Sequence, residues 1–152
     1  MQRIYLTIIL LGLLAISMQA QTAAPATSPG PVSRITFYEI KAGKGADYTK
    51  FRREHSKLIL DELKKQGVIV DYKWFTQPTG DGPNSWDVAL VVVFKTYADA
   101  LENPENGRKY DEILLKHYGS QEARDKADAF QRELRDVVSS HLMREQILNP
   151  IN

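Results

Sequence analysis

The stretch Val88-Ala89-Leu90-Val91-Val92-Val93-Phe94 decides the fold of this chain. Successive side chains of a strand point to opposite faces of its sheet, so a strand with one wet face alternates apolar and polar residues. This stretch does not alternate, and we therefore expect its sheet to be covered on both faces. Helices from the rest of the chain can cover one face, and a second copy of the chain is the simplest cover for the other.

Residues 1–20 have the pattern of a secretory signal peptide. Arg3 supplies one positive charge, and the apolar residues 4–16 that follow are fewer than the roughly 20 that a transmembrane helix needs. We expect cleavage between Ala20 and Gln21 and a secreted or periplasmic protein that is not attached to a membrane afterwards. An uncleaved anchor is the alternative, because Met18 stands where a small residue is preferred.

The composition narrows the possible classes of protein. The chain has no cysteine, which excludes a disulfide framework and a thiolate nucleophile. Its 20 basic and 19 acidic residues give a formal net charge of +1, which does not indicate nucleic-acid binding. Residues 21–31 contain three prolines and no large apolar side chain, so we expect a disordered linker there. Residues 32–150 are enough for one domain.

The spacing of apolar residues predicts the order β-α-β-β-α-β. Strands are expected at residues 32–40, 68–76 and 86–95, and a helix at residues 46–66 that ends at Gly67. Shorter helices are expected after Thr96, over residues 105–118, and from Ser120 onwards. Residues 137–148 fit either a continued helix or a last strand, and their alternation favours the strand. The stripe of the long helix comprises Tyr48, Phe51, Arg52, His55, Leu58, Ile59, Glu62 and Leu63.

This order predicts an α+β, ferredoxin-like antiparallel sheet with its helices on one face. Right-handed crossovers place the first and third strands in the centre and the other two at the edges. The other sheet face is then open, and we expect it to be packed in a homodimer. Each large apolar side chain covered in this way contributes roughly 1.5–3 kcal/mol.

Residues 35–48, Ile-Thr-Phe-Tyr-Glu-Ile-Lys-Ala-Gly-Lys-Gly-Ala-Asp-Tyr, form a first strand, a turn and an aromatic opening of the long helix. With the strand-hairpin-strand of residues 68–94, they resemble the dimeric α/β-barrel superfamily, and within it the small NIPSNAP-like and antibiotic-monooxygenase-like domains. The resemblance implies a dimer and is not specific to one activity. Members of the superfamily include cofactor-independent monooxygenases, haem-binding proteins and proteins of unknown chemistry.

Two residues of the long helix are candidates for a ligand or catalytic site. His55 lies on the apolar stripe, where a histidine can act as a general base or a ligand near neutral pH. The alternative is a histidine at the edge of the core that is hydrogen-bonded to a backbone carbonyl. Arg52 on the same stripe can hold an anionic ligand, or its guanidinium can extend to solvent along its aliphatic stem.

The strands supply further candidates. Glu39 is a candidate acid or base if it is buried in the helix-side cleft, and otherwise we expect it to pair with Lys41 or Lys44. Tyr38 and Trp74, together with Tyr72 and Trp86, can line an aromatic pocket or pack in the core and dimer interface. His141 is a candidate ligand residue on the last strand, whereas His117, at a helix C-terminus, is expected to be protonated for structural reasons. The charged residues of the last helices, Glu122, Arg124, Asp125, Lys126, Arg132, Glu133 and Arg135, are expected to be solvated surface.

No dinucleotide, phosphate-loop, serine-hydrolase or zinc-protease motif is present in the sequence, and we expect no metal and no cofactor. The interpretation we favour is an exported dimeric domain that binds a small apolar or aromatic molecule, or acts as an assembly module. The first alternative is a cofactor-independent monooxygenase-like enzyme in which His55 or Glu39 takes a proton from a phenolic substrate. The second is haem binding, with His55 or His141 as the axial ligand.

Overall fold

A computed structural model of the chain describes residues 25–77 and 85–150. The chain forms two compact units, one of which is Pro29–Ile147; the other contains the described residues 25–28 and 148–150. In the latter, the backbone N–H of Asn149 donates to the Ala26 carbonyl at 2.9 Å, and the Ser28 hydroxyl donates to Oδ1 of Asn149 at 2.9 Å. The predicted signal peptide lies outside the described residues.

The described elements follow the predicted order. They are β1 (Thr27–Ile40), α2 (Gly45–Phe51), the π-helical turn η2 (Arg52–Ser56), α3 (Lys57–Lys65), β2 (Asp71–Thr76), β3 (Val88–Phe94), α4 (Tyr97–Leu101), α5 (Pro104–Tyr118), α6 (Gln121–Leu134) and β4 (Arg135–Leu148).

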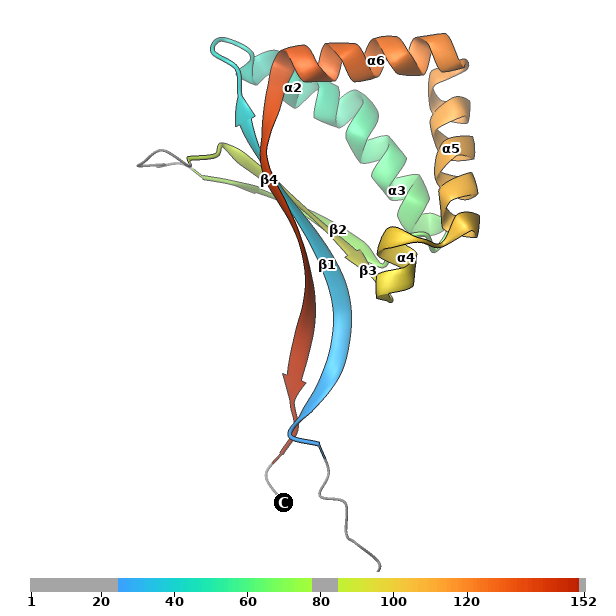
Figure 1. Cartoon of the computed structure of the whole chain (residues 1–152). Coiled ribbons are helices and arrows are strands. Elements are labelled where there is room, and N and C mark those ends of the chain that lie inside the picture. The colour runs from blue at the N-terminus through green and yellow to red at the C-terminus, as the bar shows by residue number, and fades with distance from the viewer. Residues whose placement is uncertain (1–24, 78–84, 151–152) are drawn as a thin grey trace, which may run out of the picture. The chain divides into compact units, whose positions relative to one another are not determined.

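The sheet has the strand order β2-β3-β1-β4, and β3 pairs antiparallel with both β1 and β2. This order confirms the ferredoxin-like α+β fold, because it places the first and third strands in the centre and the other two at the edges. Ile35 is paired with Val91, and Val91 is paired with Lys73 on the other side. Figure 1 shows the helices gathered on one face of this sheet.

Strand β1 begins at Thr27, earlier than the predicted start at residue 32. The predicted linker over residues 21–31 is therefore wrong for its last part, and residues 21–24 lie outside the described residues. The pairing between β1 and β3 begins at Val32, so β1 has no β3 neighbour before that residue. Pro29 and Pro31 fit this part of the strand because a proline has no N–H to offer to a second neighbour.

The long helix contains a π-helical turn that the sequence did not predict. Arg52–Ser56 forms this turn between two α-helical segments, and a π-turn adds one residue to the helical repeat. The buried side of the helix therefore moves by one position after the turn. Ile59, Leu60 and Leu63 are buried, whereas Leu58 is 51% exposed, so the predicted burial of Leu58 is wrong.

The later helices begin and end close to their predicted positions. The Thr96 hydroxyl accepts a hydrogen bond from the Asp99 backbone N–H at 3.1 Å, which caps α4. Gly119 ends α5 in the left-handed conformation with φ of 81°, and the Ser120 hydroxyl caps α6. The ambiguous segment 137–148 is a strand, β4.

The side chains on the two faces of the sheet differ in how deeply they are buried. On the helix side, Val32, Tyr38, Val88 and Phe94 are buried, and they belong to two core clusters with residues of α2, α3, α5 and α6. On the other face, Ala89 is buried between its cross-strand neighbours Phe37 and Phe75. The remaining apolar residues of that face are only half-buried or exposed. No helix in the described part of the chain is long and apolar enough to span a membrane.

Candidate functional site

The cleft between the sheet and the helices contains two adjoining hollows. The larger has a volume of about 500 Å³ and the smaller of about 200 Å³. Both are lined by Tyr38 of β1, Leu90 of β3 and Tyr110 of α5, as well as by Leu60 and Leu63 of α3. Because these walls are shared, we treat the two hollows as one site and call it the helix-side cleft.

The smaller hollow combines aromatic walls with a few polar groups. Trp74 and Tyr118 contribute rings, and Asp128, Gln131 and Arg135 contribute polar groups from α6 and the start of β4. Desolvation and the carboxylate of Asp128 raise the pKa of the Tyr118 hydroxyl. That phenol is therefore a neutral hydrogen-bond donor at physiological pH and does not act as a base.

Arg135 lies against the aromatic residues of this hollow. The carbon of its guanidinium is 3.6 Å from the ring centre of Tyr38 and 5.9 Å from that of Tyr48. Burial raises the pKa of Tyr48 to about 12, although Arg135 acts in the opposite direction. Arg135 was predicted to belong to a solvated charged surface, and this is wrong because the helix ends at Leu134 and the chain then turns into the sheet.

Arg52 also lies against Tyr48. Its guanidinium carbon is 5.1 Å from the ring centres of both Tyr48 and Trp74. Arg52 and Trp74 also line a separate hollow of about 200 Å³ between the long helix and the edge strand β2. The Nε atom of Arg52 is buried, and both alternatives for this residue, an anion-binding group and a guanidinium that reaches solvent, stay predictions.

His55 faces the other helices and does not line the helix-side cleft. Its Nδ1 lies 2.9 Å from Nε2 of His117, and its ring stacks on Tyr118 at 5.4 Å between ring centres. Among the described residues, His55 has neither the predicted position in the cleft nor the alternative hydrogen bond to a backbone carbonyl. Desolvation and the charge of His55 lower the pKa of His117, which is opposite to the shift that a helix C-terminus favours.

Glu39 and His141 lie away from the cleft. Glu39 is exposed and follows the buried Tyr38, so strand alternation directs it to the open face. The predicted pairing with Lys41 or Lys44 is not found among the described residues, and Lys41 forms its ion pair with Asp136 at 3.4 Å. His141 is exposed beside Phe37, with 6.2 Å between ring centres. His55 and Glu39 are therefore not brought together.

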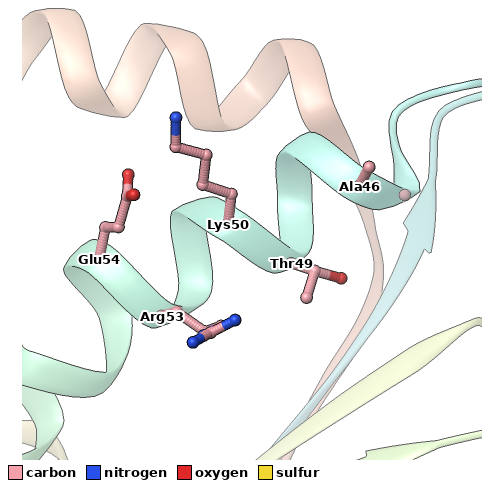
Figure 2. A pocket seen from close by; sticks show the side chains of 6 residues that line it. Ala46, Thr49, Lys50, Arg53 and Glu54 are labelled. Carbon is pink, nitrogen blue, oxygen red and sulfur yellow. The ribbon is translucent and has the colours of Figure 1, made fainter.

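A further recess of about 690 Å³ lies on the surface of α2 and η2, where its lining residues include Ala46, Thr49 and Lys50. Figure 2 shows that Lys50 and Glu54 point to one side of the helix, and Thr49 and Arg53 to the other. All its lining residues come from this one helical stretch, so no second element closes the recess. We assign no site to it.

The structure thus brings together three of the predicted site residues, Tyr38, Arg52 and Trp74, around the buried Tyr48. Three further residues of the cleft, Tyr110, Asp128 and Arg135, were not predicted from the sequence. The one usable signal was the position of Arg135 directly after the last apolar residue of a helix. In residues 25–77 and 85–150 there is no group of three or more histidine, aspartate and glutamate residues placed to hold a metal ion.

Comparison with known proteins finds no matching family model and no matching curated protein. Similar solved structures exist. One is a dimeric protein of unknown function and ferredoxin-like fold from Bacteroides fragilis, which is 15% identical over 78% of this chain and 97% of that chain, with a TM-score of 0.42.

Two further structures are similar. A dimeric ferredoxin-like protein from an uncultured marine organism is 13% identical, over 81% of this chain and 92% of that chain, with a TM-score of 0.45. A dimeric ferredoxin-like protein of unknown function from Thermobifida fusca is 11% identical, over 78% of this chain and 92% of that chain, with a TM-score of 0.35. The fold assignment therefore rests on the strand order of this chain itself, and the NIPSNAP-like and monooxygenase-like resemblance stays a prediction.

Proposed function

We propose that this chain is a small-molecule-binding domain whose ligand is an apolar or aromatic compound held in the helix-side cleft. The observation that carries the proposal is the larger hollow of about 500 Å³, which lies within the size range of ligand pockets. Its walls are mostly apolar, with Leu60, Leu90 and Phe94 among them, and Arg34 and Tyr110 add a few polar groups. Sites for small molecules combine these two kinds of lining.

The test is binding of a neutral aromatic probe, 2-naphthamide, to the purified protein by isothermal titration calorimetry. A Thr36→Phe variant places a ring in the larger hollow, because Thr36 is one of its lining residues. We expect this variant to bind the probe at least about tenfold more weakly, a loss of roughly 1.4 kcal/mol. Thr76→Phe, the same substitution at an exposed position that lines neither hollow, is the matched control. Equal binding by both variants would contradict the proposal.

We further propose that the domain functions as a homodimer through the open sheet face. The support is the apolar character of that face, where Phe75 and Met143 are 49% and 48% exposed. Ile35, Val91 and Val93 are half-buried on the same face. An apolar patch of this kind is unusual on the surface of a monomer, and a second copy offers an equally apolar and self-complementary surface.

The oligomeric state can be measured by light scattering after size exclusion. Val91→Lys places a charge at the centre of the open face, and we expect it to convert the dimer to a folded monomer. Leu58→Lys removes an exposed apolar residue from the long helix, away from this face, and is expected to remain dimeric. A monomeric wild-type protein would overturn the homodimer, and circular dichroism establishes that each variant is folded.

Export remains a proposal that rests on the apolar leader in residues 1–20. Expression of the full chain followed by cell fractionation and N-terminal sequencing tests it. We expect a periplasmic or secreted product that begins at Gln21. A product that retains Arg3 and fractionates with the membrane would support the uncleaved anchor instead.

A further inference from the structure

Two arginine side chains contact one buried tyrosine ring from different elements. Arg52 of η2 and Arg135 of β4 have their guanidinium carbons 5.1 Å and 5.9 Å from the ring centre of Tyr48. Each also contacts a second ring, Trp74 for Arg52 at 5.1 Å and Tyr38 for Arg135 at 3.6 Å. Cation–π contacts of this kind hold both guanidinium groups in place before any ligand arrives.

Three polar atoms of this cluster are buried without partners among the described residues. The hydroxyl of Tyr48, Nε of Arg52 and Nε of Arg135 each lack a hydrogen-bond partner among the described residues. Tyr48 is only 2% exposed. Buried donors are normally satisfied, and all three of these groups can donate a hydrogen bond. Three unsatisfied donors around one ring are the arrangement expected where a ligand supplies the acceptors.

The charge of the cluster is also unbalanced. Within the described part of the chain, neither Arg52 nor Arg135 forms an ion pair. Asp128 lines the same hollow as Arg135 without pairing with it. Arg53 lines the hollow that Arg52 shares with Trp74, and it forms no ion pair among the described residues. Lys57 lines the same hollow but is paired with Asp61. Positive charge therefore exceeds negative charge around the cluster, which favours an anion.

We propose that Arg52, Tyr48 and Arg135 form an anion subsite that binds the carboxylate of an aromatic carboxylic acid. The subsite lies between the helix-side cleft, which Arg135 lines, and the hollow that Arg52 shares with Trp74. This inference rests on the proposed function and adds the chemical class of the ligand. A carboxylate fits because its two oxygens match the donor pairs of guanidinium groups. Trp74 lines both neighbouring hollows and offers a ring face beside the subsite. Asp128 disfavours a second negative charge, so a monocarboxylate is preferred to a phosphate.

The subsite can be tested with acetate alone, which needs no apolar cleft. In ¹⁵N-labelled protein, the Nε–Hε signals of arginine side chains report on acceptors at Nε. We expect acetate to shift the signals of Arg52 and Arg135 in a saturable manner and to leave that of Arg108, an exposed arginine of α5, unchanged. A uniform response of all arginines, or no response, would overturn the subsite.

A pair of probes then tests the ligand class. We expect 2-naphthoate to bind at least about tenfold more tightly than 2-naphthamide, since a charge-assisted hydrogen bond contributes at least that factor. Arg135→Gln and Arg52→Gln should weaken binding of the naphthoate far more than that of the naphthamide and so remove the preference for the naphthoate, whereas Arg108→Gln should preserve that preference. Equal loss for both probes would mean that the arginines only support the fold, and the subsite would be wrong.

These experiments distinguish a failure of the proposed ligand cleft from a failure of the anion subsite. Naphthamide binding without any preference for naphthoate would retain the cleft as a ligand site and overturn the anion subsite. Specific acetate shifts at Arg52 and Arg135 without naphthamide binding would retain the subsite chemistry and overturn the apolar cleft. A stronger response to inorganic phosphate than to acetate would contradict the preference for a monocarboxylate.

Discussion

The Nδ1 atom of His55 lies 2.9 Å from the Nε2 atom of His117, and the two rings are perpendicular at 90°. One nitrogen must supply the proton and the other the lone pair, so the contact requires that at least one of the two rings is neutral. His55 comes from the π-helical turn and His117 from the end of α5. This pair therefore links the long helix to α5 through a contact that depends on protonation.

The first prediction concerns the pH dependence of stability. Desolvation and the neighbouring His55 lower the pKa of folded His117, so the unfolded chain binds more protons as the pH falls through about 6.5. The stabilising contribution is complete above that value and is lost as the pH falls toward the lowered pKa. We expect urea unfolding to show a decrease in the free energy of unfolding between about pH 7.5 and 5.5.

The matched variants for this prediction are His117→Gln and His141→Gln. The first removes the titrating group, and we expect a weaker pH dependence and a loss of about 1 kcal/mol at neutral pH. The second removes an exposed histidine and should leave the wild-type pH dependence intact. An identical pH dependence in wild type and His117→Gln would rule out this role for His117.

The second prediction follows from the π-helical turn. Leu60 is 8% exposed and Leu58 is 51% exposed, although a regular α-helix would bury Leu58. We expect Leu60→Ala to lower the free energy of unfolding by about 2–5 kcal/mol, the range for large apolar residues in a core. Leu58→Ala should cost less than about 1 kcal/mol. Chemical denaturation measures the free energy of unfolding of both variants. A larger decrease for Leu58→Ala than for Leu60→Ala would contradict the finding that Leu60 rather than Leu58 faces the core.

The burial of Leu60 and the exposure of Leu58 show which part of the fold could not be predicted from the sequence. Strand order, helix caps and the two central strands follow from local signals, such as the apolar run at residues 88–94 and Gly119 at the end of α5. The π-turn has no such signal, because Arg52 to Ser56 contains only polar residues that fit either helical repeat. Which side of the helix faces the core is set by the contacts of Phe51 before the turn and of Ile59 and Leu60 after it.

The third prediction uses two glycines of the same region of the chain. Gly119 has a φ of 81°, and an added Cβ is disfavoured in that conformation. Gly107 lies inside α5, and a Cβ built there would meet nothing within 4 Å. We expect Gly119→Ala to destabilise the protein by about 1 kcal/mol and Gly107→Ala to stabilise it by about 0.5–1 kcal/mol. Thermal melting measures both, and equal shifts of the two melting temperatures would contradict this reasoning.

The candidate site could be predicted only in part, for a physical reason. Tyr38 and Trp74 belong to strands whose alternation sets the face they occupy, so their place in the cleft follows from the strand pattern. Arg135 is the first residue of β4, directly after the last residue of α6, where neither helical nor strand periodicity determines a direction. Asp128 lies in the middle of α6 beside Ala127, at the border between the apolar and the charged side of that helix. His55 was misplaced because it belongs to the π-turn, in which the helical repeat itself changes.

The fourth prediction exploits the two tryptophans, which lie on opposite faces of the sheet. Trp74 lines the smaller hollow of the helix-side cleft, and Trp86 contacts Phe37 of the open face with 5.0 Å between ring centres. In Trp86→Phe, the remaining Trp74 should change its emission when 2-naphthoate is added and should not respond to dilution. In Trp74→Phe, the remaining Trp86 should shift to longer wavelength on dilution from about 10 µM to 10 nM, a range that covers ordinary dimer affinities. Because ligand binding and dimer formation use different faces, each variant should report one process only. A ligand response from Trp86 alone would place the binding site on the open face and would contradict both the cleft and the dimer interface proposed for this chain.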